Sequence, residues 1–154
     1  MLKISTIDKS PLKLTTKLQY KLIRGSNSIV YLFDKQVIVF TKDKAKFDFF
    51  LQEKLLKNKY IPKILGMYAD YMNGIYRIDR EVLYPITTRE KSLKIRQIEE
   101  MIKINESGYH SISDCIIKFL YNNHDVKYDL SHDWLMQTKN GKIVMADPVL
   151  WTQL

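Results

Sequence analysis

The sequence predicts a single α+β domain in which two strand hairpins flank one helix, and two further helices precede a last hairpin. Its 154 residues match the usual size of one domain, and 45% hydrophobic residues with only five Gly and four Pro are typical of a packed globular chain. β-branched and aromatic residues come in short blocks between turn residues, which indicates strands. In the second half the apolar spacing becomes that of amphipathic helices, so we expect both element types in one core.

The clearest strand signal covers residues 29–40, where IVYLF and QVIVF flank the two-residue turn Asp34-Lys35. This pattern predicts a β-hairpin. A helix is expected to begin at Asp43, a favoured N-cap residue, and to end near Asn58. Its apolar residues recur at helical spacing, at Phe47, Phe50, Leu51 and Leu55.

Strand-like residues return in MYADY and GIYRIDREVLY, which are joined through Met72-Asn73-Gly74. Asn-Gly favours a tight turn, so a second strand pair is predicted. Thr87 and Glu90 fit a capping box, with Thr87 as the N-cap of a long helix. A later helix is expected to begin at Ser111 or Ser113.

The tail reads WLMQT-KNG-KIVMADP and predicts a final hairpin whose three-residue turn ends in Gly141. No repeat, low-complexity tract or linker divides the chain, so residues 1–154 are interpreted as one domain. Within it, a sheet-rich part is predicted over about residues 20–85 and a shorter helical part over about residues 86–154.

Basic residues concentrate in the first part of the chain. Residues 1–63 hold 14 Lys and Arg against 5 Asp and Glu, whereas residues 64–154 hold 11 against 12. Such a field attracts nucleic acid, nucleotide phosphates or the acidic surface of a protein partner. The chain has no arginine-rich run and no aromatic residues interleaved with basic ones, the usual signs of a nucleic-acid reader. A lysine-rich surface that only aids solubility is the alternative.

Cysteine use and hydropathy favour an intracellular protein. Cys115 is the only cysteine, so no internal disulfide or CxxC pair can form, and its apolar neighbours indicate a packed thiol rather than a nucleophile. No window approaches the roughly 18 uncharged apolar residues of a membrane span, and the start has no signal-like apolar run. A cytoplasmic protein without a membrane partner is therefore expected.

Five residues stand in short motifs at predicted strand ends and loops. In chain order these are Gly25 in RGSNSIVY, Lys42 at the end of VIVFTK, Glu53 in the following helix, Asp129 in YDLSHDWLM and Asp147 in MADPV. In this order the motifs resemble those of a protein kinase, over about residues 20–150. The Asp-Pro dipeptide after a hairpin particularly resembles the small kinase-like proteins of bacteriophages, for which the compartment would be the host cytoplasm.

The resemblance implies a minimal two-lobed kinase-like fold, with an antiparallel sheet and one packed helix before a short helical lobe and a terminal hairpin. It also implies ATP and Mg²⁺ as cofactors. The implied roles are nucleotide binding by Gly25 and Lys42, an ion pair of Glu53 with Lys42, a catalytic base at Asp129, and metal binding by Asp147 with Asp133.

Several residues depart from the family's pattern. Trp134 stands where a second metal-binding Asn is expected, and an indole cannot ligate Mg²⁺, so Asp133 is the substitute ligand. Of three loop glycines only Gly25 is kept, which hinders a close approach of the backbone to phosphate. Phe40 replaces a small residue two positions before Lys42, and its ring is expected to crowd a bound adenine.

Two classes of function follow, with a third as a further alternative. The favoured class is a kinase-like binding protein that docks on a host or viral protein, with weak or no phosphate transfer. The second is an active minimal phosphotransferase that uses ATP and Mg²⁺. The third is a nucleic-acid-binding module that acts through the basic residues 1–63. A His/Asp metal site for hydrolysis, built around His124 and His132, is the remaining interpretation.

Overall fold

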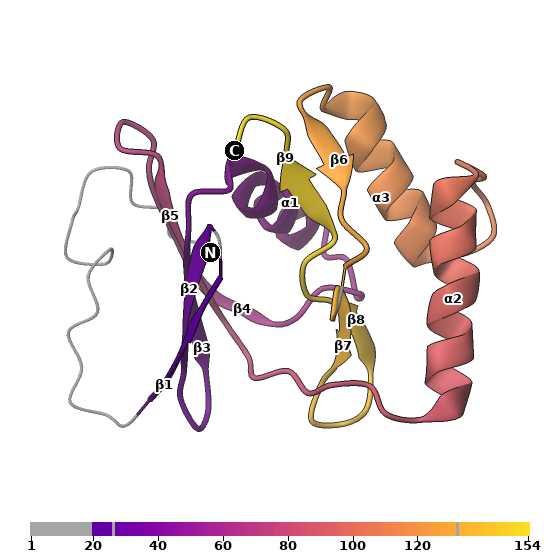
Figure 1. Cartoon of the computed structure of the whole chain (residues 1–154), viewed down its shortest axis with the longest axis horizontal. Coiled ribbons are helices and arrows are strands. Elements are labelled where there is room, and N and C mark those ends of the chain that lie inside the picture. Colours follow the sequence, from indigo (N-terminus) through magenta and orange to yellow (C-terminus); the bar gives the residue numbers. More distant parts are fainter. Residues whose placement is uncertain (1–19, 26, 132) are drawn as a thin grey trace.

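The computed structural model describes residues 20–25, 27–131 and 133–154, and in these residues the chain is a mixed α+β fold (Figure 1). The helices and strands in chain order are β1 (Lys21–Arg24), β2 (Ser28–Leu32), β3 (Val37–Thr41), α1 (Lys44–Leu55), β4 (Ile64–Asp70), β5 (Ile75–Arg80), α2 (Arg89–Lys103), α3 (Ser111–Asn122), β6 (Val126–Tyr128), β7 (Leu135–Gln137), β8 (Ile143–Met145) and β9 (Val149–Trp151).

The first five strands form one sheet in the order β1-β2-β3-β5-β4, and all neighbours are antiparallel. The predicted hairpin over residues 29–40 is confirmed as β2 and β3. Its turn is closed by a hydrogen bond from the Phe33 N–H to the Gln36 carbonyl at 2.9 Å. The second predicted pair is confirmed as β4 and β5, with Gly74 at a φ of 64° in the turn.

Helix α1 begins where the sequence predicts it. The Asp43 side chain accepts a hydrogen bond from the Lys46 N–H, as an N-cap should. Phe47, Phe49 and Phe50 are buried, and they belong to the same core cluster as the inward residues of β3. The helix therefore covers one face of the large sheet. Leu55, which the spacing placed on the apolar side, is instead 68% exposed at the end of the helix.

The caps of the later helices differ from the prediction. Thr88, not Thr87, is the N-cap of α2, and it makes no side-chain capping bond, so the predicted capping box is wrong. The N-cap of α3 is His110 rather than a serine, because the His110 Nδ1 accepts from the Ile112 N–H at 3.1 Å. A neutral imidazole nitrogen can fill the acceptor role that a hydroxyl was expected to fill.

The predicted final hairpin is confirmed as β7 and β8. Thr138 and Lys142 close its turn, where the Thr138 N–H donates to the Lys142 carbonyl at 2.9 Å. Gly141 has a φ of 81°, a conformation that favours glycine. The short pair of β6 with β9 was not predicted, since three-residue strands carry too little pattern.

Figure 1 shows the large sheet at one end of the molecule and α2 and α3 at the other, with the two short strand pairs, β6 with β9 and β7 with β8, between them. One hydrophobic cluster joins these parts, and the Phe49 ring of α1 meets the Phe119 ring of α3 at 5.1 Å. None of the described helices is both long and apolar enough to cross a bilayer.

Candidate functional site

Gly25, Phe40 and Lys42 line one cavity of about 400 Å³ at the end of the large sheet. The turn between β1 and β2 is closed by a hydrogen bond from the Gly25 N–H to the Ser28 carbonyl at 2.8 Å. A Cβ on Gly25 would be in ordinary contact at 3.5 Å from that carbonyl, so this turn does not require a glycine. The structure thus brings the predicted nucleotide-binding residues together without the open glycine loop that phosphates need.

Phe40 lies on the face of the large sheet opposite α1. Val37 and Val39 point into the core, and the alternation of a strand turns Phe40 the other way. Its ring packs against the Tyr31 ring at 5.9 Å and under the Arg77 guanidinium at 5.8 Å. The expected crowding of an adenine by Phe40 would therefore apply only to a ligand on this outer side.

Lys42 and Glu53 do not form the expected ion pair, and this part of the prediction is wrong. The Lys42 side chain is exposed beyond the end of β3, whereas Glu53 lies on α1 and is only 5% exposed. The Glu53 carboxylate accepts a hydrogen bond from the Asn58 Nδ2 at 2.8 Å. Only two residues separate the end of β3 from α1, so the helix begins before the chain can turn Lys42 beneath the sheet.

Glu53 instead belongs to a buried polar contact between α1 and α3. The Cys115 thiol of α3 lies beside the Glu53 carboxylate and also meets the Asn58 Nδ2 at 3.3 Å. Burial, together with the negative charge of Glu53, raises the pKa of the Cys115 thiol far above its usual value. The thiol stays protonated at neutral pH, which agrees with its interpretation as a packed side chain.

Asp129 and Asp147 come from chain segments that the fold places side by side. The Asp129 N–H donates to the carbonyl of Pro148, the residue after Asp147, at 2.8 Å. In the chain, the β7–β8 hairpin lies between Asp129 and Asp147. The Asp129 carboxylate accepts from the Ser131 N–H at 3.1 Å, so it holds its own loop. The backbone approach agrees with the expected arrangement of the two loops, while the role of Asp129 as a base stays a prediction.

Asp147 has cationic neighbours that the sequence did not predict. The Lys46 Nζ of α1 lies 3.4 Å from its carboxylate, and Lys46 is largely buried whereas Asp147 is 47% exposed. Arg80 lies at the end of β5, where burial lowers its pKa to about 10, and the charges of Asp147 and Glu81 oppose that shift. Arg80 therefore remains charged at neutral pH.

Asp43 completes this group, which we call the inner charged cluster: Asp43, Lys46, Arg80 and Asp147. Burial raises the pKa of Asp43, and the nearby Asp147 charge acts in the same direction, against hydrogen bonds from the Lys46 and Trp151 N–H groups. The cluster holds two carboxylates and two cations, and the nearby Glu81 carboxylate also acts on Arg80.

The other predicted metal ligand, Asp133, directly precedes Trp134, whose carbonyl accepts a hydrogen bond from the Asp147 N–H at 3.2 Å. Asp133 is exposed, in a turn where its φ is 59°. Trp134 is 2% exposed, and its Nε1 donates to the Glu99 carboxylate of α2 at 2.8 Å, so the indole serves the core and not a metal site. His132 lies outside the described residues. Among the residues that the structure describes, no three His, Cys, Asp or Glu side chains are placed to share a metal ion.

Sequence reasoning missed Lys46 and Arg80, although each carried a signal. Arg80 follows Tyr76 and Ile78 at a spacing of two, which puts an arginine on the buried face of a strand. Lys46 stands three residues after the Asp43 N-cap, on the first helical turn, which packs beside the end of the sheet. A charged residue at an inward position is the informative observation in such patterns.

No protein-family model matches the chain, and the comparison with curated proteins gave no match either.

Proposed function

We propose that this chain is a kinase-like binding protein, which docks on another protein and transfers phosphate weakly or not at all. The observation that carries the proposal is the separation of Lys42 from Glu53, since that ion pair positions the phosphate-binding lysine in an active kinase. A setting in the cytoplasm of a bacterial host fits the resemblance to phage proteins.

The kinase-like part of the proposal draws support from the order of the elements. A five-stranded antiparallel sheet carries one helix between its third and fourth strands, and two helices precede the loop of Asp129. The β7–β8 hairpin separates Asp129 from Asp147, and the backbone brings the two loops together. Strand and helix signals agree with this order along the whole described chain, which makes a chance match of isolated motifs a weaker explanation.

The inner charged cluster supports the absence of strong phosphate transfer. ATP with Mg²⁺ needs carboxylates that are free to bind metal and a cation that is free to bind phosphate. Here Asp147 already has Lys46 as a partner, and Asp43 is committed to capping α1. Binding nucleotide would require these contacts to be broken first, and the cost would appear as lost affinity.

An active phosphotransferase is the second candidate, and the contact of Lys46 with Asp147 favours it. A lysine beside the proposed metal-binding carboxylate could orient the phosphates in place of Lys42. The two candidates predict different effects of Lys46→Ala. In the binding protein this substitution frees Asp147 without a gain of activity, whereas in the enzyme it removes nucleotide binding.

Thermal unfolding with and without ATP and Mg²⁺ tests the proposal. We expect no measurable shift for the wild type or for Lys42→Ala at millimolar nucleotide. A ligand present at 100 times its Kd would stabilise the folded state by about 2.7 kcal/mol, or roughly 5–10 °C for a domain of this size. Such a shift in the wild type, lost in Lys46→Ala, would contradict the proposal and select the phosphotransferase.

A further inference from the structure

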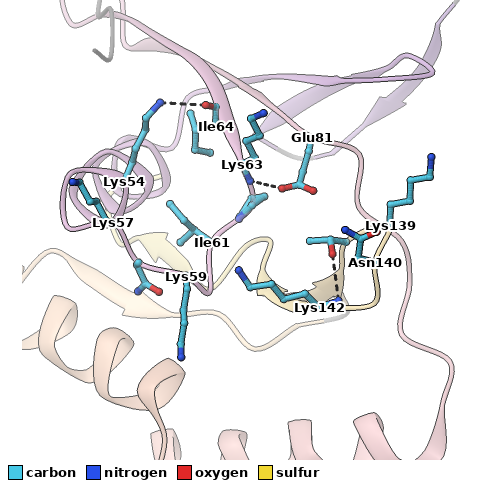
Figure 2. A pocket seen from close by; sticks show the side chains of 13 residues that line it. Lys54, Lys57, Lys59, Ile61, Lys63, Ile64, Glu81, Lys139, Asn140 and Lys142 are labelled. Carbon is cyan, nitrogen blue, oxygen red and sulfur yellow. Dashed lines mark hydrogen bonds between the residues drawn. The ribbon is translucent and has the colours of Figure 1, made fainter.

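A pocket of about 490 Å³ opens where the end of α1 and the start of β4 face the β7–β8 turn (Figure 2). One carboxylate, that of Glu81, lines it together with six lysines. We call it the lysine pocket, after Lys54, Lys57, Lys59, Lys63, Lys139 and Lys142. Basic residues were predicted to act within residues 1–63, yet two of these lysines come from the final hairpin, because folding sets that turn beside α1.

Most ammonium groups of the lysine pocket are available to a ligand, while the Lys59 Nζ lies over the Tyr60 ring, 5.3 Å from its centre. None of the six pairs with a carboxylate of the described residues within 4.0 Å. The Lys54 Nζ donates a hydrogen bond to the Ile64 carbonyl, and the Glu81 carboxylate accepts one from the backbone N–H of Lys63 (Figure 2). The other five lysine side chains are exposed, and like charges gathered this closely favour the binding of an anion.

Apolar side chains lie within and beside these cations. Ile61 and Pro62 are buried in the lining of the pocket. At the end of α1, Leu55 is 68% exposed and Leu56 is 60% exposed, directly between Lys54 and Lys57 in the chain. Leu55 and Leu56 do not line the pocket, but two exposed leucines in the same helical turn as two of its lysines are typical of a protein-binding surface.

The cationic surface continues past the β7–β8 turn. Lys142 also lines an adjoining cavity of about 760 Å³ beside α2, together with Lys91, Leu93 and Lys94. Lys91 is anchored there by bonds from its Nζ to the Gln137 side chain and the Gly141 carbonyl. The two cavities share Lys142 in their linings, so an extended ligand that passes this residue can contact both.

We propose that the lysine pocket docks an acidic segment of a partner protein, in which carboxylates alternate with apolar side chains. This inference rests on the proposed function and names the surface and the chemistry of its partner. Carboxylates would face the lysines, and apolar side chains would cover the exposed Leu55 and Leu56. No arginine lines either cavity among the described residues, so bidentate phosphate contacts have no guanidinium there, and the one aromatic ring, that of Tyr60, lies in the adjoining cavity and makes no row of rings for stacking successive bases.

The probe is a fluorescein-labelled twelve-residue peptide in which Glu and Asp alternate with Leu, and binding to the full chain is followed by anisotropy in low salt. The test variant replaces three exposed pocket lysines: Lys59→Gln, Lys63→Gln and Lys142→Gln. A matched control removes the same charge elsewhere: Lys35→Gln, Lys118→Gln and Lys127→Gln. A second variant, Leu55→Ser, tests the apolar part, and unchanged thermal unfolding verifies that each variant is folded.

We expect the pocket variant to bind the peptide about tenfold more weakly, the control to bind within about twofold of the wild type, and Leu55→Ser to lose several-fold. Equal weakening in both lysine variants would overturn the inference in favour of diffuse attraction. Tighter binding of a single-stranded oligonucleotide, insensitive to Leu55→Ser, would replace it with nucleic-acid recognition. Absence of peptide binding would also overturn it. The proposed function fails separately, through stabilisation by ATP and Mg²⁺.

Discussion

Glu53 should be coupled energetically to Asn58 and not to Lys42, and a pair of double-mutant cycles can measure both couplings. The Glu53 carboxylate is 5% exposed and accepts from the Asn58 Nδ2 at 2.8 Å. A hydrogen bond to a charged group contributes about 1.5–3 kcal/mol, and a buried acceptor that loses its donor keeps its desolvation cost. We therefore expect a coupling free energy of about 1.5–3 kcal/mol between Glu53→Ala and Asn58→Ala.

The cycle with Lys42 is the matched comparison. Because the Lys42 side chain is exposed and makes no ion pair with Glu53, Lys42→Ala should change the free energy of unfolding by less than about 0.5 kcal/mol. Its coupling to Glu53→Ala should lie within the roughly 0.3–0.5 kcal/mol error of additivity. The contrast between the two cycles, rather than either value alone, carries the test.

The assay is urea unfolding followed by circular dichroism, with all single and double variants measured at one pH. If Glu53→Ala does not fold, Glu53→Gln keeps an acceptor for Asn58 while removing the charge, and the same cycles apply. A coupling above about 1 kcal/mol between Glu53 and Lys42, with none to Asn58, would refute the reasoning. It would mean that the kinase-type ion pair forms in solution.

Three further predictions concern single residues. Phe49 is fully buried and meets the Phe119 ring, so Phe49→Ala should lower the free energy of unfolding by about 3–5 kcal/mol. If the urea midpoint shifts no more than it does for a substitution of an exposed residue, Phe49 does not lie in the core. Cys115 should react slowly with iodoacetamide at pH 8 in the folded protein and quickly in urea, because burial raises its pKa; rapid native reaction would place the thiol on the surface. His110 caps α3 through an unprotonated Nδ1, and burial lowers its pKa below 6.5. The unfolded chain then binds the proton more readily than the folded protein, so the free energy of unfolding should fall as the pH drops from about 6.5 toward the lower pKa of His110 in the folded state. His110→Asn should keep the cap and flatten this pH dependence. An unchanged pH dependence in His110→Asn would assign the effect to another group.

Much of the fold was determined by local sequence patterns. Residues 29–40 could hardly form anything but a hairpin, since two β-branched runs flank a two-residue turn, and Asp43 supplied the N-cap of α1. Gly141 fixed the turn of the last hairpin through its positive φ. These features depend on neighbours in the chain, and the sequence contains all the information they need.

The helix caps show where local patterns reached their limit. Thr87 with Glu90 and the serines after Gly108 satisfied the usual capping rules, but the structure begins α2 after Thr88 and caps α3 with His110. Alternatives one residue apart differ little in local free energy, so packing of the helix against the core selects among them. The strands β6 and β9 likewise exist only because distant segments pair.

The site depended on tertiary structure most of all. Sequence order alone suggested that Lys42 would meet Glu53, yet the direction of each side chain decides such contacts, and the short link from β3 to α1 turns Lys42 outward. Lys46 met Asp147 instead, across about 100 residues of chain. The lysine pocket arose in the same way, since Lys142 joins Lys59 only when the β7–β8 turn folds against the end of α1. Charge acts through space, so a sequence determines which charges are present and its fold decides which of them act together.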